Sequence, residues 1–397
     1  MSLQVLLTQP GGQPVDVTEY LDAGRLSLGR GLGGAGASCA FSLVNYPGVV
    51  SLADMLITWD ATPIYRGRVI RRKRTAAGDH VTRVAPDCED AVTRMRRRLV
   101  ARIYEGQRAD AIVADLLARY MPEATPVLPD LSAVIDMTYN YVTLEEAVNR
   151  IAESTGADWI LLPDDTFRMF TDAWDGPTIP VYDPDNILGE SFTDEVVNAQ
   201  FANRVWVLGA KQAAEAYKAQ TFSGNSSVFP LAYEPNYTEV RVNGVARQVH
   251  LKDNRQPDTE FIVDKKRKAV EALISLSASD TVEIRYRPTI EVVDYFEDPA
   301  SVRTYGLYEV AIKDRKITDK TAARQRGRAA LRRSATQRPV FSWQTDGTWD
   351  VYPGQRVRVV WPQWGIDQFC RLTDVNIDFQ WLGHRWRVVA SLTGEGL

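Results

Sequence analysis

The residue groups whose types and spacing could do chemistry begin with a glycine-rich stretch. Gly29, Gly31, Gly33, Gly34 and Gly36 fall within eight residues. Such a stretch can cradle a phosphate when it joins a strand to a long helix and ends in Gly-Lys-Ser or Gly-Lys-Thr. Neither the ending nor a long helix follows here. The stretch therefore favours a flexible loop over a phosphate site.

Acid–base and metal chemistry have few candidate residues. Asp164 and Asp165 are adjacent in a predicted tight turn, where the two carboxylates point apart and face water rather than act as a catalytic pair. His80, His250 and His384 are isolated and lack metal-ligand spacing. No Gly-x-Ser-x-Gly elbow occurs. We expect no catalytic, cofactor-binding or metal-binding residue and no enzymatic activity.

The three cysteines indicate reduced thiols. Cys39, Cys88 and Cys370 are far apart in sequence, and their odd number argues against a disulfide framework or a structural zinc site. Cys39 and Cys370 lie on predicted strands, where a free cysteine usually behaves as a small buried hydrophobe.

Two basic runs and the tryptophans are candidate binding surfaces. Residues 71–74 and 94–98 are arginine-rich, but the net charge is −4, which does not favour a nucleic-acid binder. For the first run, alternate strand positions point to opposite faces. A solvated hairpin tip or a protein contact is favoured, with these residues as the possible partner surface: Arg71, Arg72 and Arg74.

The ten tryptophans suggest carbohydrate binding as one interpretation. Trp343, Trp361 and Trp386 occupy strand positions that a barrel would bury. Trp361 is also next to a loop, as are Trp364 and Trp381, so these three are candidates for a partner surface.

Length and composition indicate a multidomain globular chain. The 397 residues are 45% hydrophobic and 25% charged, which suggests two to four domains. The first residues do not form a signal peptide. No stretch approaches the roughly 20 apolar residues of a spanning helix.

The first half of the chain changes from strands to a mixed pattern. Residues 1–99 read as short strands, a hairpin and a helix over 87–98 that Asp87 would cap. Residues 100–200 read as an α/β module. Apolar spacing predicts helices over 107–120 and 143–155, the second with a Thr143–Glu146 capping box and a C-terminal Gly156.

The second half returns to strands. Residues 203–210 alternate, Asn243-Gly244 predicts a type I′ hairpin, and 261–274 reads as a strand end and a short helix. A basic helix is expected over 319–335. Four strands follow, at residues 340–345, 356–361, 369–379 and 385–392.

Several of these segments resemble bacteriophage baseplate hub (tail hub) proteins. The C-terminal resemblance rests on Tyr-Pro-Gly-Gln at 352–355 and on the strands at 372–375 and 386–394. The module resembles the family in Tyr-Asn-Tyr-Val-Thr-Leu-Glu-Glu-Ala at 139–147 and Thr-Gly-Ala-Asp-Trp at 155–159. An aromatic–x–Gly strand at 65–69 resembles the first hub barrel.

The resemblance implies a β-rich α+β, multidomain fold with two tail-tube-like β-barrels and inserted α/β and β modules. The expected parts are a first barrel (1–99), an α/β module (100–200), a discontinuous second barrel (201–230 with 301–397) and a second insertion (231–300). It also implies a homotrimeric, pseudo-hexameric ring at the phage tail tip, assembled in the host cytoplasm. The ring would join a tail tube or distal tail protein to a central spike or fibre, with DNA passing through the lumen.

Two alternatives stay open. One is a hub of a related contractile injection or gene-transfer particle. The other is a β-rich carbohydrate-binding or glycan-cleaving protein, which Trp364 and Trp381 would serve. For the hub, we expect the arginines of residues 319–335 to face away from the channel, because phosphate contacts would hold the DNA.

Overall fold

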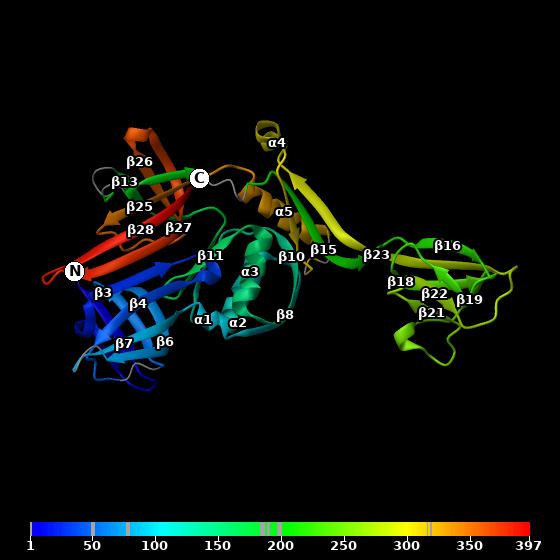
Figure 1. Cartoon of the computed structure of the whole chain (residues 1–397), viewed down its shortest axis with the longest axis horizontal. Helices are drawn as coiled ribbons and strands as arrows, with labels where there is room; N and C mark the ends of the chain where they lie inside the picture. The colour runs from blue at the N-terminus through cyan, green and yellow to red at the C-terminus, as the bar shows by residue number, and fades with distance from the viewer. Residues whose placement is uncertain are drawn as a thin grey trace. The chain divides into compact units, whose positions relative to one another are not determined.

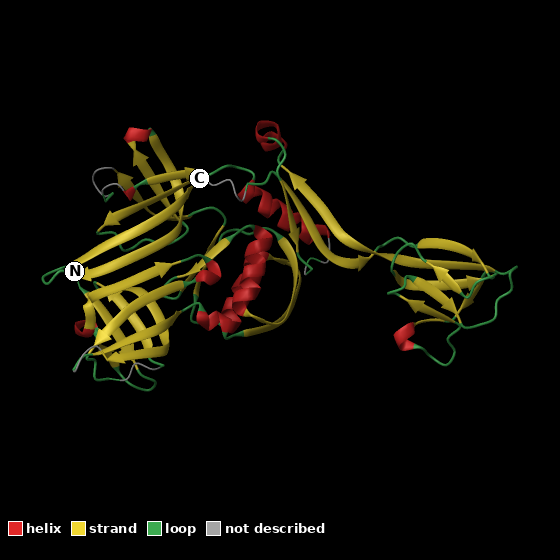
Figure 2. Cartoon of the chain, viewed as in Figure 1, coloured by secondary structure: helices red, strands yellow, loops and turns green. Residues whose placement is uncertain are grey.

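Strands dominate the chain, with a few helices between them (Figures 1 and 2). The computed structural model describes residues 2–48, 52–76, 80–182, 187, 188, 191–196, 201–315, 317 and 320–397, without the side chains of 175–182. The chain divides into two compact units. Unit 1 contains Met1–Asn203 and Ala329–Leu397, and unit 2 contains Arg204–Arg328.

Unit 1 is built on one large sheet, which has 13 strands within the described residues. Its N-terminal set is β1 (Leu3–Thr8), β2 (Pro14–Asp16), β3 (Leu21–Arg30), β4 (Ala37–Val44), β5 (Asp54–Trp59), β6 (Thr62–Ala76) and β7 (Thr82–Asp90). Its C-terminal set is β25 (Pro339–Asp346), β26 (Gln355–Trp361), β27 (Ile366–Trp381) and β28 (Trp386–Gly396), joined by β13 (Trp174–Tyr182) and β14 (Thr193–Val196). The strand order is β14-β25-β28-β27-β3-β4-β7-β6-β5-β1-β2, with β26 between β27 and β13.

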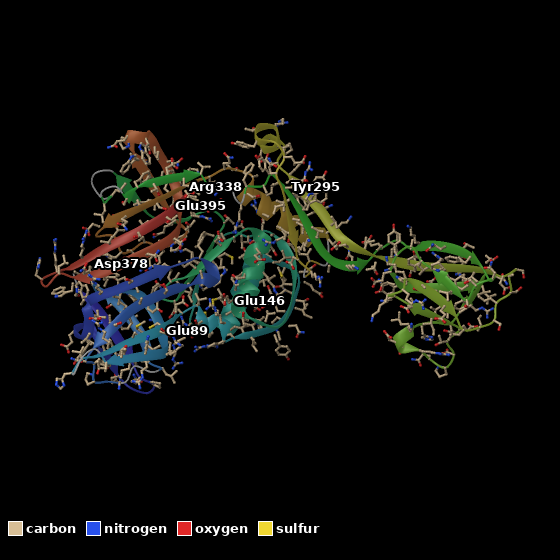
Figure 3. All side chains as sticks on the ribbon, in the orientation of Figure 1. Glu89, Glu146, Tyr295, Arg338, Asp378 and Glu395 are labelled. Carbon is tan, nitrogen blue, oxygen red and sulfur yellow. The ribbon has the colours of Figure 1, made fainter. Side chains whose placement is uncertain are left out.

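The two sets meet where β3 pairs with β27 (Figure 1). This seam is antiparallel, from Arg30 opposite Val375 to Arg25 opposite Gln380. Ser27 donates a hydrogen bond across it to Asp378, which Figure 3 labels. One edge of β27 pairs first with β26 and then with β3, while its other edge pairs with β28. The long β27 thereby makes one sheet from the two ends of the chain.

A shared core supports the seam. Alternation along the strands turns apolar side chains to one face, and one buried cluster contains residues of both sets. Trp59 of β5 lies 5.2 Å from the Phe379 ring of β27 and 6.4 Å from the Trp349 ring, measured between centroids. The two sets therefore bury their apolar faces against each other.

Arg30, at the end of β3, crosses this core and is only 5% exposed. Its guanidinium donates to the carbonyl oxygens of Trp349 (3.0 Å), Val351 (2.5 Å) and Ile64 (3.1 Å). It also lies 3.9 Å from the centroid of the Tyr352 ring. Burial lowers the pKa of Arg30, although arginine stays protonated in proteins. One buried cation thus links three segments.

The α/β module of unit 1 follows β7. It contains α1 (Thr93–Arg96), β8 (Leu99–Arg108), α2 (Ala109–Tyr120), β9 (Thr125–Val127), β10 (Val134–Thr143), α3 (Leu144–Thr155), β11 (Asp158–Leu161) and β12 (Thr166–Phe170). Thr143 caps α3 by accepting from the Glu146 N–H (3.1 Å), and Gly156 ends it at φ 74°. The apolar stripes of α2 and α3 share a core with β8, β10 and the Trp159–Phe167 stack.

Unit 2 is organised by the 17-residue β23. The unit contains β15 (Arg204–Ala213), β16 (Lys218–Ser223), β17 (Val228–Pro230), β18 (Pro235–Val242), β19 (Val245–Arg247), β20 (Val249–Leu251), β21 (Phe261–Asp264), β22 (Ala269–Ala272), β23 (Thr281–Glu297), α4 (Pro299–Tyr305) and β24 (Glu309–Lys313); α5 (Lys320–Ser334) begins in it. One half of β23 pairs with β15, and the other half pairs with β16 and β18.

The expected fold class is confirmed: the chain is β-rich, multidomain α+β. The predicted helices at 107–120, 143–155 and 319–335 correspond to α2, α3 and α5, although Asp319 lies outside the described residues. The four predicted C-terminal strands correspond to β25–β28. Asn243 (φ 49°) and Gly244 (φ 81°) both have positive φ, as a type I′ turn requires.

Three predictions were wrong in detail. Asp87 does not cap a helix, because it lies in β7 opposite Arg71. Residues 261–274 form the β21–β22 hairpin rather than a strand and a helix. Residues 201–230 do not start the second barrel, because β15 pairs with β23 and β24, while β13 and β14 join the C-terminal set. Alternation identifies a strand but not its partner.

We expect Phe379→Ala to destabilise unit 1 by about 3–5 kcal/mol, because it leaves a cavity at the seam against Trp59. Urea unfolding followed by tryptophan fluorescence measures this, since all tryptophans except Trp206 lie in unit 1. The exposed Val15→Ala, on β2, is the control, with a change below about 0.5 kcal/mol. Equal losses in the two variants would contradict a shared core.

Candidate assembly surfaces

The glycine-rich stretch forms a packed loop with acidic neighbours. Gly33–Ala35 is a 3-10 turn (η2), and the Gly31 N–H donates to the Gly36 carbonyl at 2.7 Å. A Cβ at Gly34 would collide with the Glu145 carboxylate, and one at Gly36 with that of Asp90. Burial raises the pKa of Asp90, which accepts from the Ala37 N–H at 2.6 Å. These carboxylates would repel a phosphate, and close packing explains the glycines.

Asp165 does not face water, contrary to expectation. Its carboxylate accepts hydrogen bonds from Arg66 of β6 and Arg94 of α1, and its side chain is 14% exposed. Asp164 only accepts from the Thr166 N–H at 3.0 Å, which shapes the β11–β12 turn. Asp165 thereby ties this turn to the N-terminal strand set. The pair has a structural role here.

The histidines and cysteines in the described part of the chain do not assemble into a metal site. The described residues contain no cluster of three or more His, Cys, Asp or Glu side chains suited to a metal ion. His250 contacts the Thr259 hydroxyl at 3.0 Å. Burial raises the pKa values of Cys88 and Cys370 to about 12 and that of Cys39 well above its usual value. All three cysteines are free thiols.

Most of the basic runs are neutralised locally. In residues 94–98, Arg96 contacts Glu145 at 2.7 Å, and Arg97 pairs with Glu89 at 2.5 Å. Arg71 of β6 contacts Asp87 at 2.6 Å while its side chain stays exposed. The other two candidates of that run are also exposed: Arg72 and Arg74. Arg71, Arg72 and Arg74 lie on β6, in the half of the β6–β7 hairpin that is nearer its turn.

The three tryptophans proposed for a partner surface divide into two groups. Trp361 is 8% exposed and stacks on Phe192, with ring centroids 4.6 Å apart, so it belongs to the core. Of the two interpretations of Trp361, the buried strand position is the correct one, and this side chain does not offer a partner surface. Trp364, in η5 (Pro362–Trp364), is 56% exposed. Trp381 is exposed at the end of β27 and contacts Trp386 at 5.5 Å.

Two further apolar surfaces were not anticipated from the sequence. The outer face of the β8–β10 pair exposes Leu99 and Ile103, and Tyr141 lies at a bulge with φ 52° and 73% exposure. Positive φ is strained for a bulky residue. In unit 2, Trp206 of β15 packs at 4.8 Å on Tyr295 of β23 (Figure 3), which is itself exposed. The strand-like alternation of residues 99–104 was the sequence feature from which the exposed face of β8 could have been predicted.

Comparison with known proteins identifies the fold. No protein-family profile and no curated protein sequence matches the chain. Among solved structures, a tail protein from Neisseria meningitidis MC58 aligns with TM-score 0.60 and 13% identity, covering 100% of this chain and 97% of that chain. The 43 kDa tail protein of prophage MuSo2 from Shewanella oneidensis aligns with TM-score 0.58 and 9% identity, covering 98% of both chains.

A third structure, prophage tail protein gp18 from Listeria monocytogenes EGD-e, has TM-score 0.51 and 8% identity, covering 98% of this chain and 94% of that chain. The chain therefore has the fold of phage tail proteins over nearly its whole length. Among the described residues, no helix has the length and apolar character needed to cross a membrane.

We expect Asp165→Asn to destabilise unit 1 by about 1–3 kcal/mol, because a neutral amide leaves two partly buried arginines without their shared carboxylate. Asp164→Asn is the control, since asparagine can still accept the turn hydrogen bond. Urea midpoints from tryptophan fluorescence compare the variants. A loss of stability in Asp164→Asn as large as that in Asp165→Asn would show that the contacts of Asp165 with Arg66 and Arg94 are not the cause.

We also expect slow alkylation of the native thiols. At pH 8, a thiol with a pKa of about 12 has roughly a thousandfold less thiolate than an ordinary cysteine, and the thiolate is the reacting form. Iodoacetamide should therefore label the buried Cys370 at least about a hundredfold faster in urea than in the native protein. Peptide mass spectrometry locates the label, and rapid native labelling of Cys370 would contradict its burial.

Proposed function

We propose that this chain is a structural subunit of a phage tail, the baseplate or tail-tip hub. The observation that carries the proposal is the seam between β3 and β27, which joins two strand sets from opposite ends of the chain into one sheet. Each set would supply one tube-like barrel. The tail-protein fold along nearly the whole chain supports this assignment.

The proposed assembly is a homotrimeric ring. Three chains, each with two similar strand sets, present six similar elements around one axis. Such a pseudo-sixfold ring can meet a hexameric tail tube or distal tail ring on one face and a threefold spike or fibre on the other. Symmetry matching is then the mechanism, and the chain needs no catalytic residue.

The lumen of this ring would let DNA pass without holding it. Phosphate contacts by a basic lining would retain the DNA, so the arginines of α5 should face away from the bore. Arg71, Arg72, Arg74, Trp364 and Trp381 are proposed contacts with neighbouring tail proteins. The chain would be assembled in the host cytoplasm and located at the virion tail tip.

Light scattering coupled to gel filtration tests the ring. The expected mass is three times the subunit mass of 44.5 kDa. A hexamer would indicate a plain tube or distal-tail ring. A monomer that stays single when mixed with tail-tube protein, and that binds purified host glycans through Trp364 or Trp381, would favour a carbohydrate-binding protein. Either result would overturn the trimeric hub.

The β8–β10 face is the proposed subunit contact, because its exposed apolar side chains lie on a two-stranded sheet. We expect Ile103→Asp to reduce the trimer to monomers, since a charge would be buried at the interface. Val245→Asp, at an exposed position of β19 in unit 2, is the matched control and should stay trimeric. A trimeric Ile103→Asp variant with unchanged circular dichroism would place the contact elsewhere.

A further inference from the structure

One surface of unit 2 combines exposed tyrosines with cations. Tyr217 and Tyr237 are both exposed and lie on or beside the sheet of β16, β18 and β23. Tyr237 is 68% exposed and has φ 45°, at a register shift in β18 between Asn236 and Glu239. A bulge of this kind re-aims a side chain, and positive φ is strained for tyrosine. The fold accepts this strain while leaving the ring in solvent.

The cations lie against these rings. The Arg287 guanidinium is 5.0 Å from the Tyr217 centroid and 5.1 Å from that of Tyr237, so it contacts both rings. Arg285 lies 5.4 Å from the centroid of the Tyr217 ring. Cation–π contacts restrict these long side chains before any ligand binds. We name the four residues Tyr217, Tyr237, Arg285 and Arg287 the tyrosine–arginine face.

The positive charge of this face is poorly compensated. Within the described part of the chain, Arg287 has no carboxylate within 4.0 Å, and Arg285 reaches Glu239 at 4.0 Å. The Arg287 Nε is buried and lacks a hydrogen-bond partner there. Elsewhere in unit 2, Arg204 and Lys252 form close ion pairs of 2.7 and 2.8 Å. An unpaired, pre-positioned guanidinium is suited to a carboxylate, which it can bind through two hydrogen bonds.

We propose that the tyrosine–arginine face is the docking surface for an acidic segment of a partner protein. Arg287 would bind a carboxylate of that segment, Arg285 would add longer-range attraction, and the two tyrosines would supply apolar contact area. Tyrosine and arginine are the residue types that dominate protein–protein binding energy. Charge complementarity therefore selects an acidic polypeptide.

Rigidity gives the surface its affinity. The ring contacts of Arg287 reduce the side-chain entropy lost on binding. The proposal concerns unit 2 alone and does not depend on the threefold ring.

Fluorescence anisotropy with the full chain and a labelled decaglutamate peptide tests the proposal. We expect salt-sensitive binding, and about a tenfold loss of affinity in Arg287→Gln, the loss of one charge-assisted contact. Arg287→Lys should fall between the wild type and Arg287→Gln, because it keeps the charge but loses the fork of donors. Tyr237→Ala should also weaken binding. Arg255→Gln, an exposed arginine in the connection between β20 and β21, is the matched control and should bind as the wild type does.

The outcomes decide the proposal. Equal affinity of wild type and Arg287→Gln, or no binding of decaglutamate by wild type, would overturn it. Tighter binding of oligogalacturonate than of decaglutamate would assign the face to acidic sugars and would likewise overturn the peptide partner. Circular dichroism checks the fold of each variant. The light-scattering mass of Arg287→Gln should equal that of wild type, which separates this test from that of the ring.

Discussion

The pairing of β3 with β27 is the interaction on which the rest of unit 1 depends. It joins strands that are more than 300 residues apart and makes one sheet of the two strand sets. A shift of one residue would turn Phe379 away from Trp59 and expose the shared core. Arg30 adds a second constraint, because its three carbonyl partners lie on segments that only this register brings together.

The α/β module is attached to this sheet by buried charges as well as by apolar contacts. Asp165 binds Arg66 and Arg94, and Asp158 accepts from Arg371 of β27 at 2.7 Å and from Arg333 of α5 at 3.0 Å. Ion pairs in which one partly buried carboxylate binds two arginines are costly to break. Loss of the carboxylate or of an arginine leaves a charge without its partner. These carboxylates hold the module in place on the large sheet.

The distribution of side chains suits a protein that works through its surfaces. The residues weighed as candidates for chemistry have structural roles instead: Gly34 allows close packing, Asp164 shapes a turn and Asp165 forms ion pairs. The groups that remain available are apolar or cationic and lie on strands, including Ile103 and Arg287. Rigid sheets present such groups at defined spacings, which is what assembly with other chains requires.

Local interactions were determined by the sequence itself. The apolar stripe and the caps of Thr143 and Gly156 predicted α3, because a helix is built from contacts within four residues. The positive φ of Gly244 was predictable from its turn for the same reason. The partners of β15, the stacking of Trp361 on Phe192 and the arginines around Asp165 were decided only by tertiary structure. These features depend on contacts between distant segments, which periodicity and composition do not encode.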